Sequence, residues 1–341
     1  MPTGADAIWQ WVWRAAPIGL VFLAGFLAIR YMTGMPGRSY QGVLEPLPEH
    51  ELALRDQLKA HIVMLAGTIG ERNLLRYQAL NAAAGYISQQ FREMGYTVRE
   101  QAFVVEGKTV KNLEAELPGK SHPKEIILFG AHYDSVIGSP GANDNATGVA
   151  ALLALARFAK EYRFGRTLRF VAFVNEEPPY FQGPGMGSRV YARECAQRGD
   201  RIAAMVSLET IGYYSDRDGS QSYPFPFSFF YPKTGNFVAF VGNLASRDLV
   251  RRIVAGFRKH TRFPSEGVAA PGVIPGISWS DQWPFWEEGY PAIMVTDTAF
   301  HRYGQYHTLR DTPEIIDYER LARVVVGLGH VLGELASLER H

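Results

Sequence analysis

The stretch Glu125-Ile-Ile-Leu-Phe-Gly-Ala-His132 contains four consecutive large apolar residues, at positions 126–129, and then turns polar. An unbroken apolar run of this length is typical of a strand that is buried on both faces of a sheet. The pattern repeats further along the chain, where helical and strand-like segments alternate at 147–162, 167–175, 188–197 and 202–208. This alternation predicts an α/β fold with a central, mostly parallel sheet flanked by helices.

The segments on either side extend the same fold. Upstream, the patterns predict helices at 51–66 and 73–94 and strands at 97–105 and 109–117. The Glu106-Gly107 turn makes these two strands antiparallel, so the sheet is expected to be mixed. Downstream, the patterns predict strands at 236–241 and 292–296 and helices at 246–260 and 317–334. We therefore expect one domain over 51–341, joined by a Pro/Gly-rich linker at 34–50 to an N-terminal segment at 1–33.

The composition is that of a globular protein. Of the 341 residues, 47% are apolar and 20% are charged, and the net charge of +1 gives no global field that would attract nucleic acid. The one cysteine, Cys195, excludes a disulfide framework and a zinc site built from several thiolates. A domain of this size buries enough surface to fold without a metal, so any metal here is expected to be catalytic.

The N-terminal segment departs from this average, because no residue from Ala15 to Ile29 is charged. At 1.5 Å per residue this run covers about 22 Å of a hydrocarbon layer that is roughly 30 Å thick. Arg14 and Arg30 flank the run and can reach the two interfaces, so we expect a tilted, single membrane span over Ile8–Met32. A cleaved signal peptide and a buried helix of the main domain are the alternatives.

Polar side chains follow the strands of the predicted sheet. His132 and Asp134 leave their strand on one side of the chain, where Asp134 can orient the imidazole of a metal-bound histidine. Asp144 lies in the turn that opens the next helix. Each feature also has a purely structural interpretation, as a hydrogen-bonded buried histidine and as a helix cap.

Three further groups follow later strands. A buried strand runs into Glu176 and Glu177, whose side chains point to different sides, so that one is able to bind a metal while the other acts as a base. A solvated loop is the alternative for this pair. Glu209 ends the next strand, and His301 and His307 lie in a loop after the last strand.

Ligand sites in open α/β sheets lie outside the carboxyl ends of the strands, so these groups are expected to share one cleft. The cleft would then hold the carboxylates of Asp134, Asp144, Glu176, Glu177 and Glu209. Gathering them without cations is costly, whereas two divalent ions restore near neutrality. Oxygen and imidazole ligands without thiolate suit zinc, with manganese or cobalt as alternatives. Other hydrolase and nucleotide motifs, such as Gly-x-Ser-x-Gly, Walker A and His-Glu-x-x-His, do not occur in the sequence.

The order and spacing of these groups resemble the co-catalytic di-zinc aminopeptidases of the MH clan, the family of bacterial secreted aminopeptidases, glutamate carboxypeptidase and glutaminyl cyclases. The motifs that carry the resemblance are His132-x-Asp134, the Gly-Ala-Asn-Asp144-Asn-Ala-x-Gly turn, the Glu176-Glu177 pair, Glu209 after its strand and the late His307. The resemblance covers about Leu75 to Leu335 and implies a zinc exopeptidase fold with two zinc ions per chain.

The resemblance also implies a role for each motif residue. It makes His132 and Glu209 ligands of one zinc, Glu177 and His307 ligands of the other, and Asp144 the bridge between them. Glu176 then corresponds to the general base, Asp134 to the residue that supports His132, and Tyr306 to an oxyanion stabiliser that some members have.

Two positions depart from the family pattern. Glu209 stands where many aminopeptidases of the family have Asp, and its extra methylene is expected to alter how the amino terminus of a substrate is seated. Gln282 replaces a histidine that often follows the Ser280-Asp281 pair. Nearby aromatic residues are expected to wall an apolar specificity pocket, with core packing as the alternative. They are Trp279, Trp283, Phe285 and Trp286, together with Phe225 to Phe230.

Together these observations predict a zinc-dependent aminopeptidase that hydrolyses N-terminal peptide bonds with a metal-activated water. A glutaminyl cyclase-like acyltransferase that uses one zinc and a catalytically silent binding ectodomain are the alternatives. The expected partners are a peptide substrate and, through the N-terminal helix, a membrane. Arg30 and Arg38 after the span, against Arg14 before it, favour a cytoplasmic domain, whereas the family's exported peptidases favour the opposite. We expect an extracytoplasmic domain on a single-pass anchor.

Overall fold

The computed structural model describes residues 4–339 and divides the chain into two units, Met1–Gly34 and Met35–His341. The first unit contains one helix, α1 (Gly4–Thr33). Within the described residues, no helix has both the length and the apolar character that crossing a bilayer requires. Among these residues, the membrane span predicted over Ile8–Met32 is therefore not supported. The extracytoplasmic location stays a prediction.

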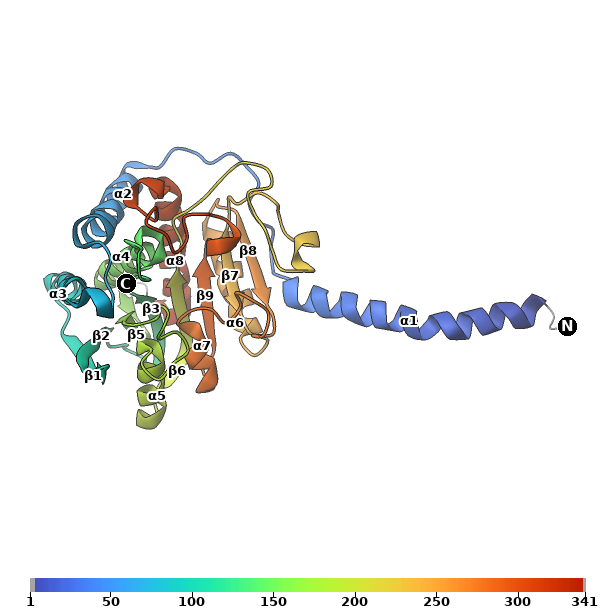
Figure 1. The fold of residues 1–341 in the computed structure, drawn as a ribbon, viewed down its shortest axis with the longest axis horizontal. Coiled ribbons are helices and arrows are strands. Elements are labelled where there is room, and N and C mark those ends of the chain that lie inside the picture. Colours follow the sequence, from blue (N-terminus) through green and yellow to red (C-terminus); the bar gives the residue numbers. More distant parts are fainter. Residues whose placement is uncertain (1–3, 340–341) are drawn as a thin grey trace. The chain divides into compact units, whose positions relative to one another are not determined.

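The second unit is built on an eight-stranded mixed sheet with the order β1-β2-β5-β3-β6-β9-β7-β8 (Figure 1). Its strands are β1 (Val98–Val105), β2 (Lys108–Leu117), β3 (His122–His132), β5 (Arg166–Phe173), β6 (Arg201–Glu209), β7 (Val238–Gly242), β8 (Ser265–Ala269) and β9 (Ala292–Thr296). The central strands β5, β3, β6 and β9 are parallel to one another, and β1, β2 and β7 form antiparallel pairs. The predicted fold class, a mostly parallel mixed sheet between helices, is confirmed.

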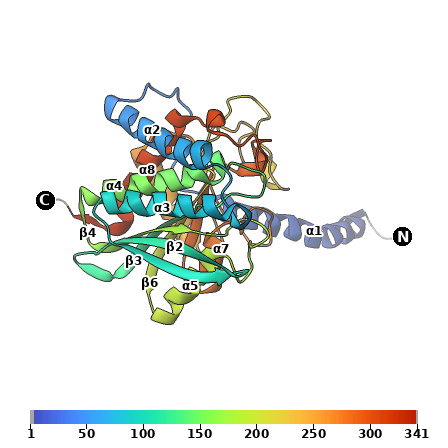
Figure 2. The same cartoon turned by 60° about the vertical axis from the view of Figure 1, so that its left-hand side comes forward.

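Helices cover both faces of the sheet, as Figure 2 shows for most of them. One face is covered by α3 (Tyr77–Glu93), α4 (Thr147–Lys160), α6 (Arg247–His260) and α8 (Tyr318–Ala336), with α2 (Glu49–Ile62) packed outside α4 and α8. The other face is covered by α5 (Gly187–Arg198) and α7 (Gln282–Glu287). Helix α4 is apolar on nearly all sides because it lies between the sheet and a second layer of helices.

The remaining elements are short. They are the helical turns at Val63–Ile69, Leu74–Arg76, Ala142–Ala146, Phe227–Phe229, Ala299–His301 and Pro313–Ile315, and the two-stranded pair of β4 (Arg163–Phe164) and β10 (Leu338–Glu339). The sequence patterns missed this pair together with β8 and α7. Strand β8 has a glycine at its centre, and its apolar and polar residues alternate only weakly. Helix α7 has six residues, one of which is a proline. Neither element therefore carries a strong periodic signal.

The topology decides where polar side chains can meet. Strands β3, β5, β6 and β9 are parallel, so their carboxyl ends lie at one edge of the sheet. His132 and Glu209 are the last residues of β3 and β6, which are neighbours in the sheet. The loop that follows β5 carries Glu176 and Glu177 to the same edge.

Candidate active site

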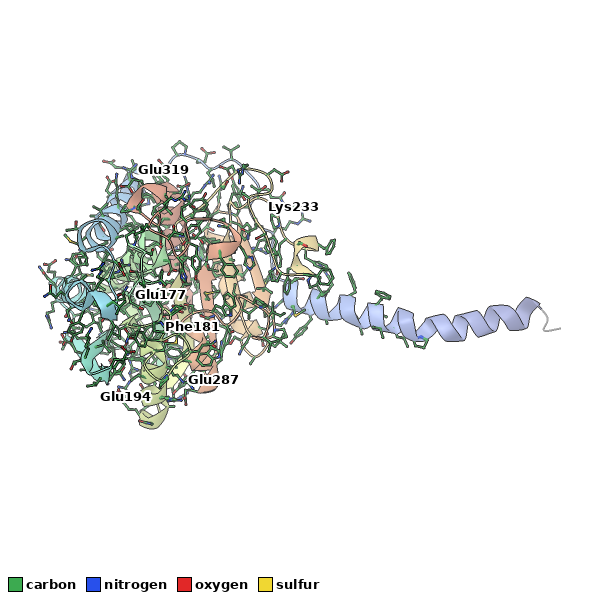
Figure 3. All side chains as sticks on the ribbon, in the orientation of Figure 1. Glu177, Phe181, Glu194, Lys233, Glu287 and Glu319 are labelled. Carbon is green, nitrogen blue, oxygen red and sulfur yellow. The ribbon has the colours of Figure 1, made fainter. Side chains whose placement is uncertain are left out.

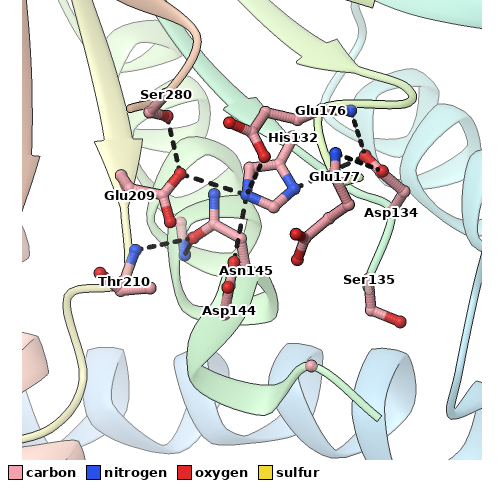
Figure 4. Close-up of polar contacts among 12 residues, drawn as sticks. His132, Asp134, Ser135, Asp144, Asn145, Glu176, Glu177, Glu209, Thr210 and Ser280 are labelled. Carbon is pink, nitrogen blue, oxygen red and sulfur yellow. Dashed lines mark hydrogen bonds and ion pairs between the residues drawn. The ribbon is translucent and has the colours of Figure 1, made fainter. Parts of the chain in front are cut away.

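The imidazole of His132 lies at the centre of a group of acidic side chains at this edge (Figure 4). Its Nε2 atom is 3.2 Å from Oδ1 of Asp144 and 3.1 Å from Oε2 of Glu209. All three side chains are buried, and their ligand atoms lie within 4.8 Å of one another. This first group, His132, Asp144 and Glu209, has the composition and spacing to hold a metal ion.

A second group shares Asp144 with the first. The other oxygen of this carboxylate, Oδ2, is 3.0 Å from Nε2 of His307, and the same nitrogen is 3.1 Å from Oε2 of Glu177. These ligand atoms also lie within 4.8 Å of one another. Asp144 therefore faces His132 with one oxygen and His307 with the other, between two neighbouring groups of candidate ligands. Glu177 lies within the interior of the domain, whereas the side chains of Glu194 and Glu319 lie towards its margin (Figure 3).

Asp134 ties the ends of two strands together. Its Oδ1 and Oδ2 atoms accept hydrogen bonds of 3.1 Å each from the backbone N–H groups of Glu176 and Glu177 (Figure 4). Oδ1 also lies 3.5 Å from Nδ1 of His132. The carboxylate is therefore placed to hold the imidazole and the glutamate loop in register; the sequence predicted the first of these contacts from the His-x-Asp spacing, and not the second.

The two adjacent glutamates point in different directions. Glu177 accepts a hydrogen bond from the backbone of Val136 with one oxygen and faces His307 with the other. Glu176 points to the opposite side, where its Oε2 atom is 3.9 Å from Nε2 of His132, and it belongs to neither group of candidate ligands. The carboxylate of Glu177 therefore lies among the candidate metal ligands, whereas the carboxylate of the adjacent Glu176 lies beside them.

Two residues that the sequence analysis did not single out hold the turn that carries Asp144. The Asp311 carboxylate accepts hydrogen bonds from the backbone N–H groups of Asn143 and Asp144, at 2.8 and 3.1 Å. The fully buried guanidinium of Arg72 donates to the backbone carbonyls of Pro140 and Gly141. It also donates to the carbonyls of Tyr133, Leu65 and Gly70. No sequence motif marks Arg72, because three of its acceptors, the carbonyls of Tyr133, Pro140 and Gly141, lie more than 60 residues away along the chain.

Gly141 is needed at this turn for two reasons. Its φ of +63° lies in the left-handed region, and a Cβ atom there would come within 2.4 Å of the carbonyl oxygen of Asp144. A side chain at position 141 would therefore push the shared carboxylate out of place.

Burial and charge shift the ionisation of the site. Burial first, and then the charge of Asp144, raise the pKa of Glu177 to about 8. Burial also raises the pKa values of Glu176 and Glu209. Burial alone would lower the pKa of His307, but Asp144 and Glu177 outweigh it and raise the pKa to about 10. Carboxylates packed this closely need compensating positive charge, which protons or metal ions can supply.

The residues present fit a metal cofactor. Both ring nitrogens of His132 and Oδ1 of Asp144 are buried, and within the described residues they form no contact with hydrogen-bond geometry. Such groups are costly to leave unpaired inside a protein, and metal coordination is one way to satisfy them. The donors are imidazole nitrogens and carboxylate oxygens, without thiolate, which is a combination that zinc accepts.

Tyr306 and His301 come from the same loop region but lie in different surroundings. The ring of Tyr306 stacks on that of His307, with centroids 3.8 Å apart. Burial raises the pKa of Tyr306 well above its usual value, so its hydroxyl stays protonated and can donate a hydrogen bond. His301 belongs to neither group of candidate ligands and lies near Ser222 instead, so the structure brings only the second of the two loop histidines to the ligand groups of the described residues.

The segment after Ile277 supports the first group. The hydroxyl of Ser280 donates a 2.7 Å hydrogen bond to Oε2 of Glu209 (Figure 4). Asp281 is fully buried beside this group, and burial raises its pKa to about 7. The side-chain amide of Gln282 donates a hydrogen bond to the carbonyl of Ile277, and Gln282 belongs to neither group of candidate ligands.

An apolar pocket begins beside Glu209 and Tyr306 and extends across the sheet to β8. Its floor is the sheet face opposite α6 and α8, formed by Ala239, Val241, Val268, Met294 and Thr296. Its walls include the aromatic side chains of Tyr223, Phe227, Tyr231, Trp279 and Phe300. The predicted aromatic pocket is therefore present, and it contains Trp279 and Phe227 from the predicted set.

The other aromatic residues of the predicted wall lie elsewhere. Phe285 is packed in the core under α5, and Nε1 of Trp286 donates to the carbonyl of Ala292. Trp283 lies under the guanidinium of Arg189. These three belong to α7, whose side chains face α5 and the sheet, so the packing alternative was correct for them.

Comparison with known proteins agrees with this geometry. Residues 112–331 match the family described as Peptidase family M28. The uncharacterized protein YfbL of Escherichia coli is 37% identical over 294 residues, which are 84% of this chain and 89% of YfbL. The chain therefore belongs to peptidase family M28 and is a zinc metallopeptidase.

Solved structures share the fold. A zinc aminopeptidase from Bacillus subtilis, BSAP, superposes with a TM-score of 0.67 at 16% identity, covering 84% of this chain and 95% of BSAP. A glutaminyl cyclase from Porphyromonas gingivalis superposes with a TM-score of 0.61 at 18% identity, covering 82% of this chain and 98% of the cyclase. These two proteins have different activities, so the shared fold does not choose between them.

Proposed function

We propose that this chain is an aminopeptidase that uses two zinc ions to hydrolyse the N-terminal peptide bond of its substrates. The observation that carries the proposal is the shared carboxylate of Asp144, which faces His132 with Oδ1 and His307 with Oδ2. Each oxygen thus belongs to a group of three candidate ligands. His132 and Glu209 would complete one zinc site, and Glu177 and His307 the other.

Zinc at these ligands would make water a nucleophile near neutral pH and polarise the carbonyl of the substrate. Glu176 supplies the proton transfers. It is buried beside both groups without belonging to either, so its carboxylate is free to accept the proton of the attacking water and to deliver it to the leaving amine. A raised pKa suits this alternation between the two forms.

Two other residues assist the reaction, one by stabilising the developing charge and the other by positioning its neighbours. Tyr306 keeps its proton and donates a hydrogen bond to the oxygen of the substrate carbonyl as negative charge develops there. Asp134 holds the backbone of the glutamate loop and supports the imidazole of His132. The apolar pocket beside Glu209 and Tyr306 accepts the side chain of the N-terminal residue.

The test combines metal removal with substrate blocking. Chelation should abolish hydrolysis of aminoacyl 4-nitroanilides and zinc should restore it, whereas N-acetylated versions of the same substrates should remain intact. Undiminished turnover after metal is removed, with its absence verified by elemental analysis, would contradict the proposal. Cyclisation of N-terminal glutamine without hydrolysis, together with one zinc per chain, would favour the glutaminyl cyclase alternative.

A further inference from the structure

The apolar pocket contains a second glutamate, far from the candidate metal ligands. Glu266 is on β8, the edge strand, and its side chain is 19% exposed. Its partner in the sheet register is Ala239 of β7, which also lines the pocket. Residues paired across neighbouring strands point to the same face of the sheet. Glu266 therefore lies on the face that forms the floor of the pocket, and not on the face that α6 covers.

The register also places the two glutamates of the pocket in one row. Glu209 pairs with Thr296, Thr296 with Ala239, and Ala239 with Glu266. Three strand spacings separate the ends of this row, which is about 14 Å between the Cα atoms. The pocket thus runs from a candidate metal ligand at one end to the carboxylate of Glu266 at the other, and a ligand must be long to reach both.

The surroundings of Glu266 suit a cation. The rings of Tyr223, Phe227 and Tyr231 line the same part of the pocket, with Tyr223 and Phe227 centred 5.6 and 6.2 Å from Tyr231. Aromatic faces attract cations and pack against aliphatic stems. His301 also lines the pocket, but burial lowers its pKa and keeps it neutral. Among the described residues, no lysine or arginine lines the pocket, and the two guanidinium groups at this end lie behind the lining, Arg302 on the ring of Phe237 at 4.6 Å and Arg258 beside Glu266.

Inside the chain, Glu266 is only partly neutralised. The guanidinium of Arg258 lies 3.6 Å from its carboxylate, at the edge of the sheet. However, Arg258 donates its hydrogen bonds to Ser265 and to the carbonyl of Pro36, and it does not line the pocket. Ser39 is a further partner of the carboxylate. Burial raises the pKa of Glu266, so this group gains from a cation that replaces its lost hydration.

We propose that Glu266 is a specificity-determining residue that selects substrates whose N-terminal residue is lysine or arginine. This inference rests on the proposed aminopeptidase function. The aliphatic stem of such a side chain lies on the apolar floor, and its charged end meets Glu266 between the aromatic rings. Shorter or acidic side chains are disfavoured, the first because they do not reach Glu266 and the second because they are repelled by it.

The experiment compares lysine and norleucine 4-nitroanilides, whose side chains have the same stem with and without the ammonium group. The wild-type protein should hydrolyse the lysine substrate with the higher kcat/KM. Glu266→Gln should lower the lysine-to-norleucine ratio about tenfold, mostly through KM, because a charged hydrogen bond is lost while the pocket keeps its size. A matched control is Glu288→Gln, which removes a carboxylate that pairs with Arg193 at 3.8 Å outside the pocket.

A fall of at least threefold in the ratio for Glu266→Gln, with less than twofold for Glu288→Gln, supports the inference. A smaller fall, an equal fall in both variants, or wild-type hydrolysis of norleucine without lysine overturns it and leaves the aminopeptidase function standing. Absence of hydrolysis with every aminoacyl substrate overturns both. Should Glu266→Gln fail to fold, competitive inhibition of the wild-type protein decides: lysinol should bind about tenfold more tightly than norleucinol, and equal inhibition constants overturn the inference.

Discussion

The two ligand groups that meet at Asp144 are held by the fold in different ways. His132 and Glu209 are the last residues of two paired central strands, and both are buried, although Glu209 also lines the apolar pocket. Glu177 and His307 lie in loops instead, and the side chain of His307 is 29% exposed, with a φ of +57°. The first group is therefore built into the sheet, whereas the second takes its ligands from loops, and His307 is the more exposed of these two ligands.

This difference predicts unequal metal sites. Ligands on strands of the sheet are pre-positioned, so the first site should bind its zinc tightly and exchange it slowly. The second site takes Glu177 and His307 from loops, whose positions the sheet constrains less than those of strand residues. We expect the more weakly held zinc to be the one that Glu177 and His307 complete.

The largest effect should come from the residue that both groups share. Asp144→Asn keeps the size of the side chain but removes its charge, so both sites lose a ligand at once. Zinc content should fall at both sites, and activity should fall to that of the chelated protein. Elemental analysis of the purified variant checks this, and retention of one full zinc would show that Asp144 serves one site alone.

Substitutions of the two adjacent glutamates should have different effects, one on turnover and the other on zinc binding. Glu176→Gln removes a proton acceptor outside both ligand groups, so turnover should fall by roughly 10²- to 10⁴-fold while zinc content holds. Glu177→Gln should instead weaken the second zinc, and excess zinc should partly restore activity. Zinc loss in Glu176→Gln with full occupancy in Glu177→Gln would reverse the two assignments.

A smaller effect is expected from the support of the first group. Asp134→Asn weakens the hold on His132 and on the backbone of the glutamate loop. Loss of such supporting residues typically reduces metal affinity or activity about 10- to 100-fold. The zinc affinity of the variant, measured with a competing chelator, checks this; an unchanged affinity would mean that the imidazole is held by its neighbours alone.

The smallest effect concerns acid stability, away from both groups. Burial first, and then Arg157, lower the pKa of His61 to about 4, and its Nδ1 is 2.6 Å from the hydroxyl of Tyr86. Because the unfolded chain takes up this proton near pH 6.5, the folded state loses stability as the pH falls from 6.5 towards 4, by at most about 3 kcal/mol.

His61→Gln should therefore flatten the dependence of the unfolding free energy on pH in that range, as urea titrations at several pH values would show. His50→Gln, at a histidine whose side chain is 81% exposed, is the matched control and should leave the slope unchanged. An equal slope in the His61 variant would assign the acid sensitivity to other groups, including those of the metal site.

The sequence predicted the central fold because its strands and helices carry strong local patterns. The run at 126–129 is buried on both faces, and the helix that begins at Thr147 packs between the sheet and further helices. The weakly patterned β8 and α7 could not be found in this way. The membrane span predicted over Ile8–Met32 was not supported, since no helix within the described residues has the length and apolar character of a span.

The sequence predicted those residues of the candidate site that directly follow strands or belong to motifs. It did not predict the residues that are placed in the site by long-range hydrogen bonds. His132, Glu209 and Glu177 could be named from their positions after strands. Arg72 and Asp311 could not, since they bind backbone atoms more than 60 residues away along the chain. Glu266 was missed for a similar reason, because only the sheet register brings it into the pocket that begins at Glu209.

The central claim, two unequal zinc sites that share Asp144, is tested most directly by measuring zinc per chain at graded chelator strength. The wild-type protein should hold two zinc ions and release them in two steps. His307→Ala should lack the step at low chelator strength and retain one tightly bound zinc, whereas His132→Ala should lose the tight step. One zinc per wild-type chain, or simultaneous release of both ions in a single step from all three proteins, would contradict the account.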